Sequence, residues 1–535
     1  MMMATGYRDQ KDFNDMGSFG PSDRLKPGQT VFLPRGSNQA RGLARYAIAF
    51  LCGDPQPIGT ATLDRLERFH LDSVGCGVSA LAMKANAPTV LRREALAAPP
   101  SLADAGRRTG ALCFGAGRFS AVEKVVAANV SAVREWDSNG TNFGYDPLRG
   151  RTAGEFGHND FYPVAIAAAH LAGLDGNTTL RLMLLIDEIR GRLAEVFALR
   201  KYAIDHVHHG AVASAVAFTA ALGGTEDHIE SAVGLVVAHY VPFRAIRAGH
   251  QLSDSKGASA ALAAETAVIS SFRALAGFVG PADVFRNPLA IYRLNQPCPD
   301  GESPFDLELG QSEDAFAIHG MHFKLGLYEH QSAGAIAALI NLLTRYPALA
   351  GDIDGISALR VKIYEPAFSI IADPAKRWPS TRQSADHSLP YIVARTLWKA
   401  RVAQTPDWTE LMLLPEDYYN EAIQAAEIRV LIEKIAIEHG GREYDEKYPD
   451  GIPTSVQIDH ATAGVLESGL VQYPLGHARS DPGRTAAVLD LKFARLVAAA
   501  VDDPQALRER MKIGGRSVEE IAELYAFSIH GCDPG

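Results

Sequence analysis

Alanine-rich segments with apolar residues at helical spacing run through roughly the first 300 residues of this chain. Apolar residues three and four positions apart share one face of a helix, and small alanine side chains let such faces cross closely. The pattern predicts a mainly α fold, with a large all-helical domain over residues 36–318 behind a polar arm at residues 1–35. The helices are expected at residues 40–51, 61–84, 116–133, 162–173, 178–200, 210–222, 226–241 and 256–278.

The amino-acid composition changes near residue 280, where clustered prolines and glycines indicate a loop or linker. Beyond it, a helix is expected at residues 331–346 and alternating apolar residues in ISALRVKIYEPAF predict a strand. Two further strands are expected at 454–461 and 470–476. This part, residues 319–483, therefore reads as a smaller α+β domain. The tail, residues 484–535, is helical again and is expected to return to the helical domain.

The composition favours a soluble globular protein over a membrane or nucleic-acid-binding protein. The 535-residue chain has a net charge of −10, with 47% apolar and 21% charged residues. These values are typical of a soluble globular protein and argue against a nucleic-acid partner. No apolar run approaches the ~18 residues of a membrane-spanning helix, and the polar N-terminus resembles neither a signal nor a transit peptide. We expect a cytoplasmic protein without a membrane partner, or a protein of the mitochondrial matrix if the source is eukaryotic.

The cysteines are few and widely spaced. None has a second cysteine close enough for a CxxC pair, which disfavours a zinc site or an iron–sulfur cluster. An odd number of scattered cysteines is typical of a reducing compartment. The five lie at positions 52, 76, 113, 298 and 532.

One loop-like stretch, residues 134–169, is dense in acid, base and hydrogen-bonding side chains. It opens with Asp137 and Thr141 and closes with His158 and Asp160, and the residues between them include Gly144, Pro147, Gly150 and Gly154. Polar side chains at this density do not form a hydrophobic core, and a loop of this kind is typical of a functional site. The alternative, equally supported by local sequence, is that these residues only cap helices and turns.

Three cations are candidate ligands for an anion. Lys256 is expected in the first turn of a helix capped by Ser253 or Asp254, where free N–H groups favour an anion, and Arg247 lies just upstream. The alternative for Lys256 is a solvated side chain. Lys324 has mainly apolar, aromatic and histidine neighbours, so it either snorkels to the surface or pairs with an anion.

Histidines suggest two further possibilities. His387 and Tyr391 flank Pro390, where a helix is expected to begin, and could bind a substrate carboxylate or only cap that helix. A metal site is a weaker hypothesis, because no HExxH-like spacing is present and no carboxylate stands beside the histidines. The histidines concerned are His206, His208, His209, His319, His322 and His330.

Several of these motifs together resemble the MmgE/PrpD family. They are DSNGT followed by GHND, SDSKGASAA, the FK of MHFKLG, HSLPY and YPLGHAR, and their order and spacing match from about residue 40 to residue 526. The segments RAIRAGHQLSDSKGASAA, GFVGPADVFRNP and EHGGREYDEKYPDGIP are most similar to the longer members that dehydrate 2-methylcitrate. The resemblance implies a homodimer, a lid-like smaller domain, a site between the domains, and chemistry on a small tricarboxylate without a metal or other cofactor.

The resemblance also implies roles for individual residues. Asp137, Thr141 and His158 match the catalytic loop of the family, and Asp137 and His158 are expected to exchange protons with the substrate. The expected substrate-binding residues are Lys256, Lys324, Arg247, His206, His387 and Tyr391, with His208 or His209 as alternatives to His206. Gly140 stands where family dehydratases carry a second acid, and HND replaces their usual HPSDN, so the general base stays open.

Dehydration of 2-methylcitrate is therefore the expected reaction. Within the family, decarboxylation of cis-aconitate and other lyase or epimerase reactions on di- or tricarboxylates are alternatives. A protein that binds tricarboxylates without turning them over is another, motivated by Gly140.

Overall fold

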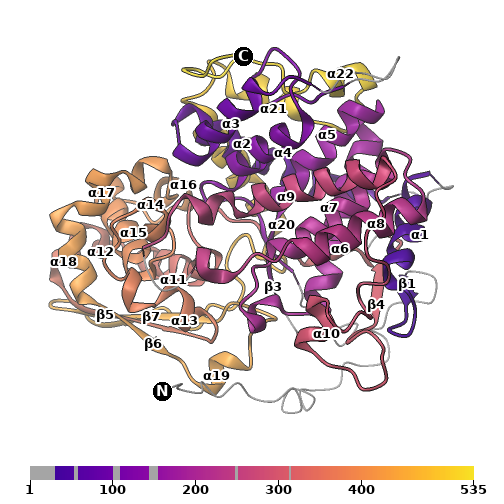
Figure 1. The fold of residues 1–535 in the computed structure, drawn as a ribbon. Coiled ribbons are helices and arrows are strands. Elements are labelled where there is room, and N and C mark those ends of the chain that lie inside the picture. The colour runs from indigo at the N-terminus through magenta and orange to yellow at the C-terminus, as the bar shows by residue number, and fades with distance from the viewer. Residues whose placement is uncertain (1–29, 53–57, 101–108, 144–154, 248–250, 313–314) are drawn as a thin grey trace.

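The computed structural model describes residues 30–52, 58–100, 109–143, 155–247, 251–312 and 315–535, and only the backbone of residues 52, 142–143 and 155–158. Helices dominate, as the sequence predicted. Figure 1 shows them in two parts, a larger helical part and a smaller part that contains a sheet.

The larger part is a bundle of long helices whose small side chains form the contacts. Helix α9 packs against both α4 and α7, and Ala260, Ala264 and Ala267 on α9 are completely buried. Such close crossings are what the alanine-rich pattern predicted. The helices are α1 (Gln39–Cys52), α2 (Thr60–Ala82), α3 (Asn86–Ala97), α4 (Val122–Arg134), α5 (Tyr162–Ala172), α6 (Gly176–Val196), α7 (Val207–Ala221), α8 (Glu226–His239), α9 (Asp254–Leu275) and α10 (Ile291–Asn295).

Two short antiparallel pairs accompany the bundle. Strand β1 (Thr30–Leu33) pairs with β4 (Leu307–Gly310), so the segment expected as a linker near residues 280–310 is partly a strand and a helix. Strand β2 (Thr141–Phe143) pairs with β3 (Glu155–His158). The helix expected over 116–133 begins only at Val122, because Ser120 pairs with Ala111 in an isolated β-bridge.

The smaller part is a four-stranded sheet with helices packed on it. The strand order is β6-β5-β7-β8, with β5 (Ile356–Ile363) parallel to β6 (Ile435–His439) and antiparallel to β7 (Thr454–His460), which pairs with β8 (Gly464–Glu467). Helices α11 (Ala333–Arg345), α15 (Leu389–Ala403) and α18 (Ala426–Lys434) lie above the sheet in Figure 1. The shorter helices are α12 (Ala348–Gly351), α13 (Ala367–Ile371), α14 (Arg382–Ala385), α16 (Trp408–Leu411), α17 (Asn420–Gln424) and α19 (Arg442–Asp445).

Two of the three expected strands form, β5 and β7. The third prediction, a strand over residues 470–476, is wrong: Val471 makes only an isolated bridge to Thr454. Pro474 has no N–H to give to a ladder, and Gly476 takes a left-handed φ of 93°, so extended pairing stops there.

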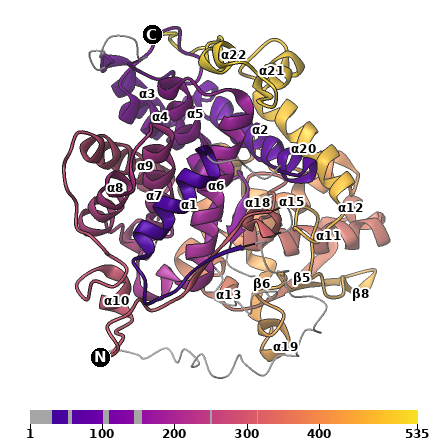
Figure 2. The ribbon, with the colours of Figure 1, turned by 90° about the vertical axis from the view of Figure 1, so that its right-hand side faces the viewer.

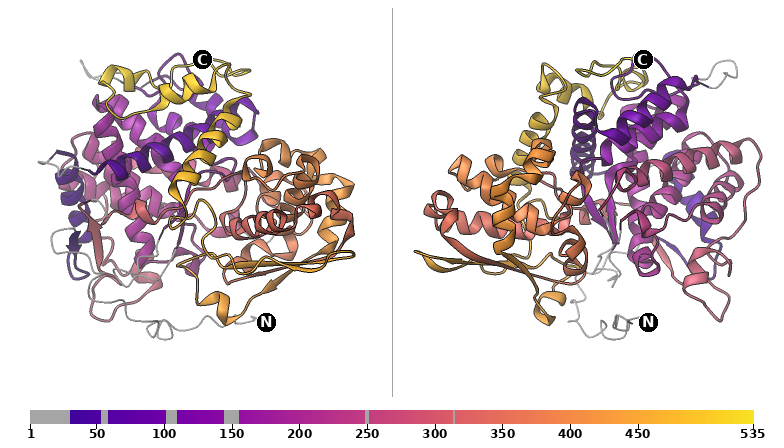
Figure 3. Two further views of the ribbon diagram at one scale, coloured as in Figure 1. Left: turned by 180° about the vertical axis from the view of Figure 1, so that it is seen from behind. Right: turned by 60° about the vertical axis from the view of Figure 1, so that its left-hand side comes forward.

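The C-terminal segment lies against the larger part. Its helices are α20 (Pro482–Val497), α21 (Pro504–Met511) and α22 (Val518–Ala522). Helix α20 packs on α2 and α22 on α5, as Figures 2 and 3 show for the segment at the yellow end of the colour scale. Among the described helices, none is both long enough and apolar enough to cross a membrane.

Candidate active site

The candidate site is built around Asp137, in the turn that follows helix α4. Its φ is 51°, in the left-handed region that aspartate tolerates better than most residues. Only 2% of the residue is exposed. A carboxylate buried to this extent needs cationic or hydrogen-bonding partners.

Among the described residues, three cations contact Asp137. Arg134 Nη1 lies 2.7 Å from its Oδ1, and Lys256 Nζ lies 3.1 Å from its Oδ2. Lys324 Nζ forms an ion pair with the carboxylate and donates to the Asp137 backbone carbonyl at 2.8 Å. Lys256 stands in the first turn of α9, and both lysines are buried. Neither lysine is therefore a solvated or snorkelling side chain.

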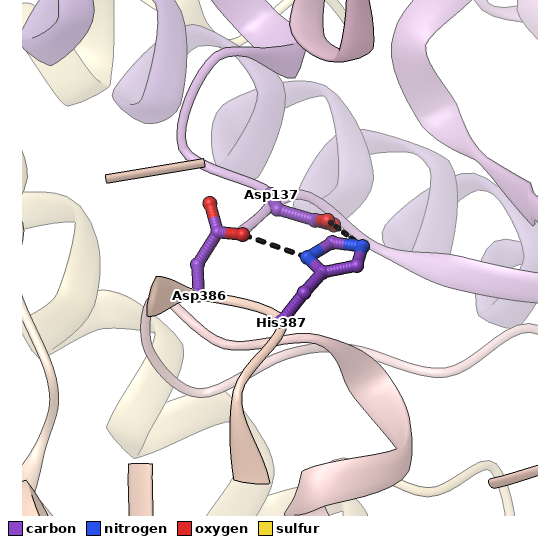
Figure 4. Close-up of side chains that lie close together, drawn as sticks. All are labelled: Asp137, Asp386 and His387. Atoms are coloured by element: carbon purple, nitrogen blue, oxygen red, sulfur yellow. Dashed lines mark hydrogen bonds and ion pairs between the residues drawn. The ribbon is translucent and has the colours of Figure 1, made fainter. Parts of the chain in front are cut away.

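The smaller part contributes Asp386 and His387, which precede α15. Figure 4 shows the imidazole between two carboxylates: Nδ1 lies 2.7 Å from Asp386 Oδ1 and Nε2 lies 3.3 Å from Asp137 Oδ2. Lys256 bridges the same carboxylates, because its Nζ donates to Asp386 Oδ1 at 2.8 Å. The cap of α15 is Ser388, so His387 is not a helix cap. The centre joins residues from both parts of the molecule.

The charges set the protonation states of this centre. Burial alone would raise the pKa of Asp137, but Arg134, Lys256 and Lys324 outweigh it and hold that pKa well below its usual value. Burial, assisted by Lys256, lowers the pKa of His387 to about 3. At neutral pH Asp137 is therefore ionised and His387 is neutral. A neutral imidazole carries one N–H, so His387 donates to one of its two carboxylates, Asp386 or Asp137, and faces the other with a lone pair.

Several buried polar atoms around this centre lack a protein partner within the described residues. Lys256 has two acceptors for three ammonium hydrogens. Both ring nitrogens of His330 and both amide atoms of Gln331 are buried without a hydrogen bond, and the charges of Lys324 and Asp137 act on His330. Unmatched buried polar groups of this kind are completed by water or a ligand. The centre therefore has unused hydrogen-bonding capacity.

The two ends of the predicted catalytic loop lie side by side. Thr141 is opposite His158 in the β2–β3 pair, and the Asn159 N–H donates to the Gly140 carbonyl at 3.4 Å. Thr141 also exchanges two backbone hydrogen bonds with His322, of 2.8 and 2.7 Å. The side chain of His158 lies outside the described part of the structure, so its predicted role stays a prediction.

Packing explains Gly140, the departure from the family pattern. A Cβ atom at this position would lie 2.2 Å from Cε1 of Phe69, whose ring stacks on Phe323 with centroids 3.9 Å apart. No side chain fits there without moving that ring. The Gly140 N–H donates to Asp72 Oδ2 at 3.0 Å, so another buried carboxylate contacts the loop.

Tyr391 is not among the groups that contact Asp137. It is fully buried in the first turn of α15, and its hydroxyl donates to the backbone carbonyl of Asp417. Its predicted role in orienting substrate oxygens therefore requires that the hydroxyl exchange this bond for one to a ligand.

Arg247 and His206 belong to a second buried network. Arg247 forms an ion pair with Asp205 and donates to Ser259 Oγ at 3.0 Å. His206 lies between Arg190, 3.2 Å from Nδ1, and Arg247, 3.4 Å from Nε2. Burial and these arginines hold the pKa of His206 well below its usual value, although Asp205 opposes the shift.

The structure also distinguishes His206 from its neighbours. His208 Nδ1 contacts the Tyr240 carbonyl at 2.9 Å and His209 Nε2 contacts the Phe197 carbonyl at 2.9 Å. Both rings are thus engaged by backbone groups. Of the three histidines in DHVHHG, His206 is the one that joins the charged network.

The histidines singled out as possible metal ligands do not come together as a metal site in the described residues. His322 instead stacks on His330 and on His477, with centroids 5.0 and 3.9 Å apart. One group of suitable ligand atoms does exist, formed by Asp137, Asp386 and His387. Lys256 and Lys324 hold the same carboxylates, so a metal cation would have to compete with two ammonium groups for them.

Sequence reasoning missed several residues of this region, Arg134 among them. Asp386, which bridges Lys256 and His387, stands beside a histidine in the noted motif ADHSLPY and could have been found there. Glu329 is buried, and burial together with Asp137 raises its pKa to about 7. Lys492 and Asp72 form a buried ion pair of 2.6 Å behind the loop. Only the folded chain shows that these residues meet.

Comparisons with known proteins agree with the resemblance. Models of the MmgE/PrpD N-terminal domain and the MmgE/PrpD C-terminal domain match residues 41–296 and 328–513. Alkylcitrate dehydratase phiI of a fungal species (strain ATCC 74256) is 25% identical over 347 residues, which cover 63% of this chain and 65% of that protein, just under two thirds. The 2-methylcitrate dehydratases of Escherichia coli K12 and Cupriavidus necator are 24% identical over 428 and 433 residues, covering 76% of this chain and 80% of each relative.

Proposed function

Because this chain belongs to the MmgE/PrpD family, we propose that it is a hydro-lyase that removes water from 2-methylcitrate to give 2-methyl-cis-aconitate, a step of propionate catabolism in the methylcitrate cycle. We place it in the cytoplasm, as a homodimer that uses no metal or organic cofactor. One observation carries the proposal: buried cations and a neutral histidine from both parts of the chain converge on a single carboxylate. This arrangement suits a substrate with three carboxylates and a hydroxyl.

The cations serve binding and catalysis together. Removing a proton from carbon next to a carboxylate places a second negative charge on that carboxylate, and nearby ammonium groups stabilise it. Lys256 and Lys324 are the proposed partners, with Arg247 and His206 assigned to a more distant carboxylate. Thr141 and Tyr391 orient substrate oxygens in this proposal.

Elimination also needs a base for the carbon-bound proton and an acid for the leaving hydroxyl. Asp137 and His158 are the proposed pair, with the direction of transfer open. The geometry adds His387: its Nε2 faces Asp137 Oδ2 at 3.3 Å, and the two atoms together can hold one proton. The carbon–hydrogen bond breaks, a carbon–carbon double bond forms, and the hydroxyl leaves with a proton as water.

A substrate panel with purified protein tests this function. With 2-methylcitrate, ultraviolet absorbance should rise as the double bond forms, no carbon dioxide should be released, and activity should survive a chelator. Loss of activity on chelation, restored by added metal, would overturn the cofactor-free mechanism. Carbon dioxide release from cis-aconitate would instead establish a decarboxylase.

A binding measurement tests the alternative that the protein binds tricarboxylates without catalysing a reaction. Calorimetric titration with 2-methylcitrate and no turnover would indicate a tricarboxylate-binding protein. Light scattering tests the dimer, which should have twice the 57.5 kDa mass of the chain.

A further inference from the structure

Lys492 is a buried lysine on the C-terminal helix α20, and all three of its ammonium hydrogens have protein acceptors. Its Nζ lies 2.6 Å from Asp72 Oδ1, 2.5 Å from the Ser138 carbonyl and 2.8 Å from the Lys324 carbonyl. The side chain is 1% exposed. Three acceptors satisfy an ammonium group completely, so Lys492 has no hydrogen left for a ligand.

The two carbonyls show which backbone segments Lys492 connects. Ser138 follows Asp137 directly, and the other carbonyl belongs to Lys324, the lysine that binds the Asp137 carboxylate. One ammonium group therefore ties together the backbones that carry both partners of this ion pair. Asp137 also has a left-handed φ of 51°, a conformation that persists only where its surroundings stabilise it.

Helix α20 is placed to serve this purpose. It packs along α2, which supplies Asp72, and Phe493 contacts α2 at Gly75, where a Cβ would lie 3.1 Å from the ring. Asp72 reaches the same loop from the other side, since its second oxygen accepts the Gly140 N–H at 3.0 Å. Figure 3 shows α20 descending toward the junction of the two parts.

We propose that Lys492 is a positioning residue that sets the distance between the Asp137 carboxylate and the Lys324 ammonium group, and thereby the rate of the reaction. This inference rests on the proposed function for its kinetic consequence, but its geometric consequence is independent of it. The competing explanation is that the Lys492–Asp72 pair only stabilises the packing of α20 on α2.

Three variants separate these explanations. Lys492→Met keeps the side-chain volume but leaves Asp72 as an unpaired buried carboxylate, so it should lower both stability and kcat. Lys492→Met/Asp72→Asn removes that unpaired charge and should recover part of the stability. Asp72→Asn alone keeps the bonds from Lys492 to the Ser138 and Lys324 carbonyls. It removes the buried counter-charge of Lys492, so it should lower stability without releasing the two carbonyls, and it is the matched control.

The value of kcat should depend on whether the ammonium group of residue 492 is present, and not on the melting temperature of the variant. We expect kcat to fall at least tenfold in Lys492→Met and to stay equally low in the double variant, while Asp72→Asn stays within about fivefold of the unchanged protein, consistent with loss of one net hydrogen bond. If kcat recovers in the double variant together with its stability, the pair is only structural and the proposal fails.

Hydrogen exchange measured by mass spectrometry gives a readout that needs no turnover. Peptides covering residues 137–143 and 322–327 should both exchange faster in Lys492→Met and in the double variant. In Asp72→Asn the peptide 322–327 should be unchanged, and only the first peptide can change, because the Gly140 N–H donates to Asp72 Oδ2. Unchanged exchange in these peptides would overturn the proposal even if the protein dehydrates 2-methylcitrate. An inactive unchanged protein would instead refute the proposed function, and the exchange data would still decide the role of Lys492.

Discussion

Asp137 and Asp205 are both buried aspartates in charged networks, and they differ in what holds them. Asp205 is held by Arg247, whose remaining bonds go to neighbouring protein groups. Asp137 is held by two lysines as well as an arginine, and by a histidine from the smaller part. The networks are joined through Arg134, Asp160, Arg190 and His206.

The difference lies in how firmly the cations are fixed on each carboxylate. A guanidinium forks onto a carboxylate and is fixed there, whereas an ammonium is a compact charge with three independent hydrogens. Lys256 keeps one hydrogen without an acceptor in the described chain, and the neutral ring of His387 can donate to only one of the two carboxylates that flank it. Asp137 therefore stands in a cluster that keeps unused hydrogen-bonding capacity, and Asp205 in one where the guanidinium of Arg247 is fixed on the carboxylate.

Asp137→Asn should have the largest effect. It removes the charge shared by three cations and the oxygen that faces His387, so kcat should fall by ~10²–10⁴, the usual contribution of a positioned acid or base. Stability should also fall, because buried cations lose their counter-charge. Turnover is therefore measured well below the melting temperature. Near-normal kcat in the folded variant would remove Asp137 from the mechanism.

Asp205→Asn is the matched test at the other network. Leaving Arg247 without its buried partner should cost about 3–5 kcal/mol of unfolding free energy. Turnover of the folded protein at saturating substrate should stay within about tenfold, since one interaction without transition-state preference mainly changes KM. Urea unfolding and kcat measured on both aspartate variants check the comparison. A loss of kcat as large as that of Asp137→Asn would show that both networks act in the chemistry.

Glu329→Gln tests a buried carboxyl near the Asp137 network that forms no ion pair with any cation of the described residues. Burial raises its pKa from 4.5 to about 7, so the unfolded chain loses this proton first and stability falls as pH rises between those values. A shift of this size corresponds to about 3 kcal/mol. The variant should therefore match the unchanged protein at pH 4.5 and be more stable at pH 8, as urea unfolding would show. Asp137 has the opposite effect on stability, because its pKa is lowered on folding. The stability that its charge contributes is lost only as the pH falls to strongly acidic values. Equal pH dependence in both proteins would contradict the raised pKa.

Local patterns predicted the parts of this molecule that depend on neighbours in sequence. Alanine spacing located the long helices, and the position of Lys256 three residues into α9 followed from its capping sequence. The strand over residues 470–476 failed because one proline and one glycine outweigh an apolar pattern. Strands β6 and β8 were missed, since five and four residues carry little periodicity.

Long-range contacts explain what the sequence did not show in the candidate site. The meeting of Asp137 with Asp386 depends on how the two parts pack, which no local motif encodes. Lys492 did carry a signal: it occupies the apolar face of its helix, with Leu489, Phe493 and Leu496 as buried neighbours. A lysine at such a position is either paired or strained. Its acceptors, however, come from three distant segments.

Lys256→Met and Lys324→Met should have the smallest of these effects and give the finest test of the comparison. Each variant removes a charge-assisted hydrogen bond of ~1.5–3 kcal/mol, so kcat/KM should fall by roughly 10- to 150-fold. Because charge grows on the substrate carboxylate in the transition state, part of this loss should appear in kcat and part in KM. Lys399→Met is the control: Lys399 is largely buried and pairs with Asp417 at 2.7 Å, which keeps Arg395 as a second partner. If both lysine variants match this control in kcat and KM, the ammonium groups around Asp137 only balance its charge and take no part in binding or catalysis.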